Sequence, residues 1–451
     1  MTIRTATAVA ALALVMAFPA AAQAPAPATV IHAGALLARP GQTPAGPSTI
    51  VIRGGRIEAV HAGLRDPAAA GAPGAKVVDL SDQFVLPGLI DLHVHLFNDD
   101  DKMRSRLEAV NRDIEDQMVI GVDNARRTLE AGFTTVRDLG SEARSITALR
   151  EGINNGLLPG PGIVPAGRAI SITAGHGDPA NNLNRDLTEA AQAHATNVCD
   201  GPEDCRRAVR AQISQGAEVI KFMATGGVNS NIAGGLGRQM FDDEMKAIVD
   251  TAHMFGRKVA AHAHGADGIA AALNAGVDTI EHGTFGDKET DALFKKTGAW
   301  YVPTMVAPRA ALAQARAGAR SRNTLEKAEI TARTAFDNYK RAIAAGVKIA
   351  FGTDSGVSDH GKNGEEFGLM VQSGMTPAAA IRAATVDAAE ALGRSQTLGS
   401  IEPGKDADIV AVASSPLADV TQLERPTFVM KSGVVFKLRG ERQAFPPLDR
   451  R

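Results

Sequence analysis

The chain has 451 residues, of which 44% are hydrophobic and 22% charged, and its formal net charge is −2 at pH 7. This length accommodates one large domain and a smaller one. The near-neutral charge gives no electrostatic reason to expect a nucleic-acid partner. One Trp and two Tyr are too few for an aromatic platform that stacks bases or sugars.

Residues 1–24 are predicted to be a signal peptide. Arg4 supplies the positive start, residues 8–18 form the apolar middle, and Ala22-Gln-Ala24 fits the small-x-small cleavage pattern. A membrane anchor is the alternative, but the apolar run is shorter than the roughly 20 residues that a span needs. We therefore expect an exported protein, periplasmic or secreted, with no membrane span once the signal is removed.

Both ends of the remaining chain have the pattern of short strands. Near the start, residues 49–53 and 56–60 are joined by Gly-Gly, which predicts a hairpin. Near the end, residues 407–413 and 427–436 have the same apolar character. We predict one small β-sandwich domain built from residues 25–85 plus 398–451, flanking a central domain over residues 86–397.

The central domain repeats one pattern, in which a helical segment ends in Gly and an apolar strand follows. Glycine suits the residue after a helix because it accepts left-handed φ without a Cβ clash. The strands of this pattern are 134–138, 218–222, 258–262, 278–282, 300–304 and 348–352, and residues 89–95 and 162–171 add two more. Eight strands alternating with helices predict an α/β fold of the (β/α)₈ TIM-barrel type. The alternative, an open doubly wound sheet, usually carries a phosphate-binding glycine motif after its first strand, and this chain has none there.

The only two cysteines are Cys199 and Cys205, which flank a Gly-Pro pair that lets the chain turn back. Export makes a disulfide permissible, so we predict a Cys199–Cys205 bridge. Two free thiols remain the alternative, and a zinc site on this pair is disfavoured because the chain has no companion cysteine.

Candidate metal ligands stand where the predicted strands end, which is where TIM-barrel active sites lie. His93 and His95 are two apart on the first strand, so both imidazoles point to the same side. Lys221, His262, His282 and Asp354 end four later strands. Taken singly, each has a structural explanation as a snorkelling lysine, a hydrogen-bonded core histidine or a capping aspartate. Six such residues at one barrel mouth predict a metal site instead.

These residues resemble those of the metal-dependent amidohydrolase superfamily, and the match runs in order across nearly the whole mature chain. Supporting motifs are Ala174-Gly-His-Gly177, Lys221-Phe-Met-Ala-Thr-Gly-Gly227, Ala261-His-Ala-His-Gly265, Ile280-Glu-His-Gly283 and Gly352-Thr-Asp-Ser355. Within the superfamily the chain is most similar to the exported prolidase-like, Xaa-Pro dipeptidase-like subgroup. That subgroup includes enzymes that degrade ochratoxin.

The resemblance implies a binuclear centre of two divalent ions, expected to be zinc. His93, His95 and Asp354 would hold one ion, His262 and His282 the other, and a CO₂-carboxylated Lys221 would bridge them. A hydroxide between the ions would attack an amide carbonyl, with Asp354 as general base and then general acid. His264 is the alternative to His262. His176, in the loop after the third strand, would polarise the carbonyl or its oxyanion.

The substrate-contacting residues are less sharply defined by the sequence. His360 follows the eighth strand and is a candidate contact. Arg309, in the run with Arg316, Arg320 and Arg322, is a candidate for binding a substrate carboxylate, since the planar guanidinium matches two oxygens. A solvated or subunit-contact helix is the alternative for that run. Relatives often carry Tyr after the sixth-strand His-Gly, where this chain has Thr284-Phe285.

The sequence thus predicts a hydrolase that cleaves the amide bond of dipeptides or small N-acyl amino acids, with ochratoxin-type amides as further candidates. A homo-oligomer is expected from the resemblance. A lactonase would keep all six ligand positions and stays open. A mononuclear cyclic-amidine hydrolase or deaminase typically lacks the bridging lysine, so Lys221 argues against it. A catalytically dead binding homologue would normally have lost ligands, and none is missing here.

Overall fold

The computed structural model describes residues 27–99, 111–181, 183–232, 234–318 and 322–445. The predicted signal peptide lies outside these residues. Among the helices of the described ranges, none is both long enough and apolar enough to cross a membrane.

The central domain contains two parallel sheets that together line a ring. One has the order β5-β6-β7 and the other β11-β10-β9-β8. Their bounds are β5 (Leu89–Val94), β6 (Phe133–Asp138), β7 (Gly162–Pro165), β8 (Val219–Met223), β9 (Lys258–Gly265), β10 (Thr279–Phe285) and β11 (Trp300–Val302).

Backbone hydrogen bonds close the ring at its two gaps. Between β7 and β8, Glu218 N donates to Pro165 O over 2.8 Å and Met223 N to Ile170 O over 2.9 Å. On the other side the segment 348–355 takes the place of the eighth strand. Tyr301 N donates to Lys348 O over 2.9 Å, and His95 N donates to Ser355 O over 2.7 Å. The predicted (β/α)₈ barrel is therefore confirmed.

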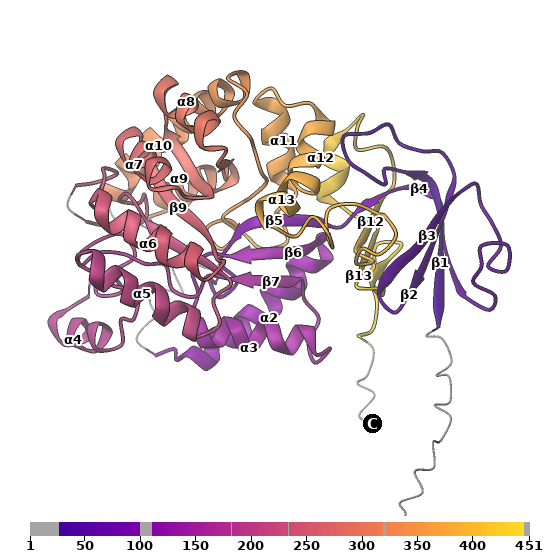
Figure 1. The fold of residues 1–451 in the computed structure, drawn as a ribbon, viewed down its shortest axis with the longest axis horizontal. Coiled ribbons are helices and arrows are strands. Elements are labelled where there is room, and N and C mark those ends of the chain that lie inside the picture. The colour runs from indigo at the N-terminus through magenta and orange to yellow at the C-terminus, as the bar shows by residue number, and fades with distance from the viewer. Residues whose placement is uncertain (1–26, 100–110, 182, 233, 319–321, 446–451) are drawn as a thin grey trace, which may run out of the picture.

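Helices surround the barrel, and Figure 1 shows them on its outside. Gly276 and Gly298 end two of the helices in left-handed conformation, with φ of 98° and 76°, as the helix-Gly-strand pattern predicts. The helix bounds are α2 (Ile114–Glu130), α3 (Ala143–Asn154), α4 (Arg185–Ala193), α5 (Pro202–Ser214), α6 (Asp242–Met254), α7 (Ala266–Ala275), α8 (Lys288–Thr297), α9 (Val306–Arg316), α10 (Arg322–Ala344), α11 (Glu365–Gln372), α12 (Pro377–Ala383) and α13 (Val386–Ala391).

The small domain is one mixed sheet of eight strands in the order β15-β14-β13-β12-β4-β1-β2-β3. Strand β4 pairs with β1 in parallel and with β12 antiparallel, so it joins the two ends of the chain. Figure 1 shows the indigo and yellow strands side by side. Their bounds are β1 (Ala28–Leu36), β2 (Ser48–Arg53), β3 (Arg56–Ala62), β4 (Lys76–Pro87), β12 (Ile409–Val412), β13 (Phe428–Lys431), β14 (Val434–Leu438) and β15 (Glu441–Arg442).

This sheet curls until its distant hairpins touch. Ala407 N donates to Gly55 O over 2.9 Å, and a Cβ on Gly433 would lie only 3.0 Å from Gly55 Cα. The strands on both sides of β4 therefore enclose one shared apolar core, which includes Ile50 and Phe428. The predicted β-sandwich is therefore formed by one continuous sheet that folds over this core.

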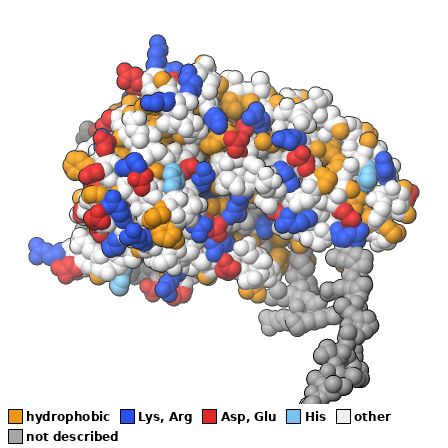
Figure 2. Space-filling view, in the orientation of Figure 1, with side chains coloured by type: hydrophobic (Ala, Val, Ile, Leu, Met, Phe, Trp, Pro, Cys, Tyr) orange, Lys and Arg blue, Asp and Glu red, His pale blue; other side chains and the backbone are white. Residues whose placement is uncertain are grey.

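The surface carries acidic and basic side chains in mixture. Figure 2 shows Lys and Arg interspersed with Asp and Glu over the visible face. This distribution agrees with the formal charge of −2.

Candidate metal centre and active site

The barrel places all six predicted ligands around one cavity of about 240 Å³. Four of them stand on β5, β8, β9 and β10, namely His93, Lys221, His262 and His282. His95 directly follows β5, and Asp354 lies near the end of segment 348–355. His176 and His264 line the same cavity. Because parallel strands of a barrel end at the same rim, residues far apart in sequence meet here.

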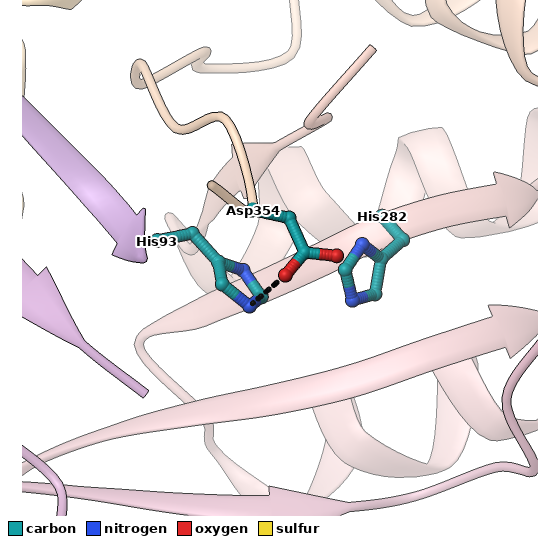
Figure 3. A group of neighbouring side chains, drawn as sticks. All are labelled: His93, His282 and Asp354. Atoms are coloured by element: carbon teal, nitrogen blue, oxygen red, sulfur yellow. Dashed lines mark ion pairs between the residues drawn. The ribbon is translucent and has the colours of Figure 1, made fainter. Parts of the chain in front are cut away.

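Asp354 is the centre of this group. Its Oδ1 lies 3.1 Å from Nε2 of His95 and 3.5 Å from Nε2 of His93. Single ligand atoms of His93, His282 and Asp354 all lie within 4.8 Å of one another. Figure 3 shows the Asp354 carboxylate between the two imidazoles. This spacing lets one ion contact several of these atoms at once.

Left-handed backbone conformations help to assemble the group. A regular strand would send Glu281 and His282 to opposite faces. His282 instead has φ of 68°, and both side chains point to the barrel interior, Glu281 to His93 and His282 to the cavity. Asp354 also has a positive φ, of 57°. Each such residue costs about 1–2 kcal/mol, and this strain concentrates at functional sites.

In each of the four predicted histidine ligands, one ring nitrogen is held by another group of the protein. Nδ1 of His93 donates to Glu281 Oε2 over 2.9 Å, and Nδ1 of His95 donates to Gly140 O over 3.2 Å. Nε2 of His262 donates to Gly226 O over 3.2 Å, and Nδ1 of His282 lies 2.8 Å from Thr304 Oγ1. Partners of this kind set the tautomer and orientation of histidines that bind metals.

Burial keeps most of these imidazoles neutral, which is the form that binds a cation. It lowers the pKa of His93 to about 4 and that of His264 to about 3. Burial also lowers the pKa of His262 and of His282 well below the ordinary value. His95 is the exception: burial opposes its charge, but the Asp354 carboxylate raises its pKa above the ordinary value.

Lys221 fits a site that takes up a further group. Its side chain is 2% exposed, and its Nζ has no hydrogen-bond partner in the described part of the chain. Burial lowers its pKa to about 8, so about a tenth of it is unprotonated amine at pH 7, far more than for an exposed lysine. An orphaned buried amine is costly unless something pairs with it. Nitrogen and carboxylate donors with this lysine among them suit zinc or a similar divalent ion.

Beneath the cavity lies a buried charge network that the sequence analysis missed. Glu281 and Arg137 form a fully buried ion pair, with 2.8 Å between Oε1 and Nη2. Burial opposes the charge of Glu281, but Arg137 and His93 outweigh it and hold its pKa at about 2. The signal in the sequence was one charged residue within each of two buried strands, Arg137 on β6 and Glu281 on β10. Their pairing depends on the barrel closing.

Asp91 is a second buried carboxylate below the site. It accepts hydrogen bonds from the backbone of His93 and from both the backbone and hydroxyl of Thr353. Asn363 donates to it as well, over 2.8 Å. Asp91 thus ties the first strand to the segment that carries Asp354.

His176 lies against the glycine loop that follows β8. Its ring centroid is 4.6 Å from that of His262, and its Nδ1 is buried without a partner in the described structure. A Cβ on Gly227 would lie 2.3 Å from the ring, so only glycine allows this approach. A disulfide joins Cys199 to Cys205 and ties the far end of the His176 loop to α5.

The structure does not bring the two candidate substrate contacts into the cavity. His360 is buried behind His95, with its Nε2 3.1 Å from His95 O. Arg309 is exposed on α9, while its neighbours Ala307 and Pro308 line the cavity. Arg316 pairs at the surface with Glu329 over 3.7 Å. Arg320 lies outside the described residues, as does the side chain of Arg322.

The chain matches known proteins over most of its length. A family model described as "Amidohydrolase family" matches residues 84–436. Ochratoxinase of Aspergillus niger is 34% identical over 368 residues, covering 78% of this chain and 75% of the relative.

Solved structures agree with this sequence match. A Xaa-Pro dipeptidase with bound methionine in its active site has a TM-score of 0.84 at 36% identity, covering 91% of this chain and 100% of that one. A prolidase complexed with N-methylphosphonate-L-proline has a TM-score of 0.82 at 31% identity, covering 92% and 100%.

Proposed function

Because this chain belongs to the amidohydrolase family, and is thus a hydrolytic enzyme that acts on amides, we propose that it cleaves the amide bond of dipeptides or small N-acyl amino acids. The observation that carries this proposal is the convergence of His93, Asp354 and His282 beside the orphaned Nζ of Lys221. The names of the similar proteins point to the same substrates, since they include a Xaa-Pro dipeptidase and an ochratoxinase.

Two divalent ions, with zinc as the expected metal, complete the site in this proposal. His93, His95 and Asp354 would hold one ion, and His262 and His282 the other. Lys221 would react with CO₂ through its amine lone pair, forming an N–C bond as one C=O π bond opens and losing one proton, and the carbamate oxygens would serve as further ligands. Bound ions of this kind lower the pKa of water and polarise a carbonyl.

The protein's own residues then move the protons. Asp354 accepts a proton from the attacking water and delivers it to the leaving nitrogen, as general base and then general acid. Its Oδ1 lies 3.1 Å from Nε2 of His95, and the imidazoles of His93 and His95 outweigh burial and hold the pKa of Asp354 below its ordinary value. The carboxylate is therefore ionised and able to accept a proton, which supports this role. His176, whose Nδ1 is unpartnered, hydrogen-bonds the oxygen on which negative charge develops.

The size and lining of the cavity favour small substrates with an apolar part. Its volume of about 240 Å³ lies just below the range of about 300–1,000 Å³ that is usual for ligand pockets. The apolar part of its lining consists of Met223, Val228, Ala307, Pro308, Ala311 and Val357. A dipeptide or N-acyl amino acid matches this space better than a long peptide does.

Export and self-association belong to the same proposal. The signal-like residues 1–24 support a periplasmic or secreted location. A homo-oligomer is proposed from the resemblance to the prolidase-like subgroup.

The test pairs metal content with a substrate panel. The mature protein, prepared with zinc and bicarbonate, is analysed for metal per chain and then assayed on Xaa-Pro and other dipeptides, N-acyl amino acids, ochratoxin A and lactones. Two ions per chain and release of a free amino acid support the proposal. Turnover of lactones alone, or a single ion with full activity, contradicts it.

A further inference from the structure

One buried threonine on α10 lacks the hydroxyl hydrogen bond that Thr251 and Thr385 make. Thr331 is fully buried, yet its Oγ1 has no hydrogen-bond partner in the described structure. Buried helical hydroxyls usually bond to the carbonyl four residues earlier. Thr251 does so to Ala247 over 2.7 Å, and Thr385 to Ile381 over 2.7 Å. An unsatisfied hydroxyl costs about 1–3 kcal/mol, so its position needs a reason.

The hydroxyl belongs to the wall of the catalytic cavity. Thr331 lines it together with the metal-ligand candidates, and Asn229 lines it as well. The Oδ1 atom of Asn229 is buried and also lacks a partner in the described structure. Rotation of the amide about its last bond exchanges Oδ1 and Nδ2, so Asn229 presents either an acceptor or a donor.

Lys327 links α10 to the loop that carries Asn229. Its Nζ donates to Gly227 O over 2.8 Å and to Ser230 O, the carbonyls on either side of Asn229. Thr331 is one turn further along α10, on the same face of the helix. Asn323 Nδ2 fixes the same loop by a 2.8 Å bond to Asn231 Oδ1. We call Asn229, Lys327 and Thr331 the α10 subsite.

The α10 subsite has a positive character. Lys327 is 6% exposed, and no carboxylate forms an ion pair with it among the described residues. Its charge lies directly behind the cavity wall, since its Nζ donates to the backbone of the loop that carries Asn229. An unpaired hydroxyl and amide beside an uncompensated cation suit an anion with two acceptor oxygens.

We infer that the α10 subsite binds the free carboxylate of the amino-acid part of the substrate. This inference rests on the proposed function, which supplies a substrate with such a carboxylate. The Thr331 hydroxyl and the Asn229 amide donate to its two oxygens, with Lys327 adding charge from behind the loop. The apolar part of the cavity lining contacts the substrate side chain. Selection of a free acid thus falls to α10 rather than to Arg309, which is exposed on α9.

The test uses pairs of substrates in which the free carboxylate of the amino-acid part is either present or replaced by a neutral carboxamide. N-acetyl-L-alanine, N-acetyl-L-leucine and N-acetyl-L-phenylalanine are compared with their carboxamides, by kcat/KM and by calorimetric binding. Thr331→Val keeps the shape and removes the hydroxyl. We expect it to lower kcat/KM about tenfold or more for the acids, mainly through KM, and clearly less for the carboxamides, whose neutral oxygen accepts a weaker hydrogen bond. Thr331→Ser should restore the acid preference.

Two further variants sharpen the result. Asn229→Asp places a like charge in the subsite and should reverse the preference toward the carboxamide. Thr251→Val is the matched control, because it removes a buried helical hydroxyl outside the cavity and should not change the acid-to-carboxamide ratio. Thr331→Val should keep or raise the melting temperature, since the lost hydroxyl had no partner, whereas Thr251→Val should lower it.

The outcomes separate the inference from the proposed function. If Thr331→Val lowers kcat/KM equally for acids and carboxamides, or for neither, the inference is overturned. Amide hydrolysis by the wild type would still uphold the proposed function. A wild type that hydrolyses no amide but binds acids more tightly than carboxamides, in a Thr331-dependent way, upholds the subsite and contradicts the function. Absence of any acid preference in wild-type binding and turnover also overturns the inference.

Discussion

Oε2 of Glu281 lies 2.9 Å from Nδ1 of His93, and the other carboxylate oxygen pairs with Arg137. The side chain that orients the first metal-ligand candidate is therefore itself fixed by a buried ion pair.

Replacing Glu281 by Gln is expected to weaken metal binding by about 10–100-fold, because the partner that sets the His93 tautomer is altered. Competition with a chelator measures this affinity. Glu289→Gln, at an exposed position on α8, is the control and should bind metal as the wild type does. Unchanged affinity in Glu281→Gln would show that the carboxylate serves only the Arg137 pair.

Lys221→Met tests the bridging carbamate. The variant keeps an unbranched side chain but cannot react with CO₂, so metal content should fall from two ions to one or none. Activity should fall at least about 10³-fold, since bound ions lower the activation barrier by several kcal/mol. Elemental analysis and the mass of one CO₂ on the intact wild type are the readouts. Two ions and full activity in the variant would refute the assignment.

His176→Ala tests the residue assigned to the developing oxyanion. Loss of one such donor lowers kcat by about 10²–10³-fold. Metal content should not change, because His176 is outside the ligand set, and this separates it from His262→Ala, which should lose metal. If His264→Ala rather than His262→Ala loses metal, the alternative ligand assignment is correct. Full kcat in His176→Ala contradicts its role.

The pH dependence of stability can be tested at Asp278, away from the metal site. Burial opposes its charge, but hydrogen bonds from Lys258 and His253 outweigh this and lower its pKa. A lowered pKa means stability that is present above the ordinary value and is lost as pH falls through the folded-state value. Asp278→Asn should therefore unfold more easily at pH 7, by about 1 kcal/mol, while the difference shrinks at acidic pH. A constant difference across pH would contradict this.

The Cys199–Cys205 disulfide should stabilise the loop that carries His176. Replacing both cysteines by Ser is expected to cost about 2 kcal/mol, in the chain-entropy account of a short loop. Hydrogen exchange should increase between residues 171 and 200. A reductant should lower the melting temperature of the wild type toward that of the variant and should not affect the variant. Equal exchange in both proteins would show that backbone bonds alone hold the loop.

Much of the fold followed from local pattern. Glycines after helices, such as Gly276 and Gly298, identify where strands begin, and eight strands alternating with helices imply a barrel. The ligand positions followed because a barrel brings strand ends to one rim. Neither inference needs to know how any side chain packs.

What the sequence could not provide depends on side-chain direction and on long-range partners. His360 and Arg309 follow barrel strands, yet one points behind His95 and the other to solvent. In the sequence, nothing distinguishes Thr331 from other residues of a helix. Its unpaired, buried hydroxyl is evident only in the folded structure. Glu281 and His282 point inward together because of a positive φ that no strand pattern predicts.

The pairing of β4 with both β1 and β12 has a consequence for the order of assembly. β4 runs almost directly into β5, the strand that ends in the first two histidines. One edge of β4 can pair as soon as the first strands exist, but the other edge waits for a partner more than 300 residues later. The strand entering the catalytic barrel is thus secured on both sides only when synthesis is nearly finished. Shortening the carboxyl terminus through β12 should therefore impair the active centre at a distance.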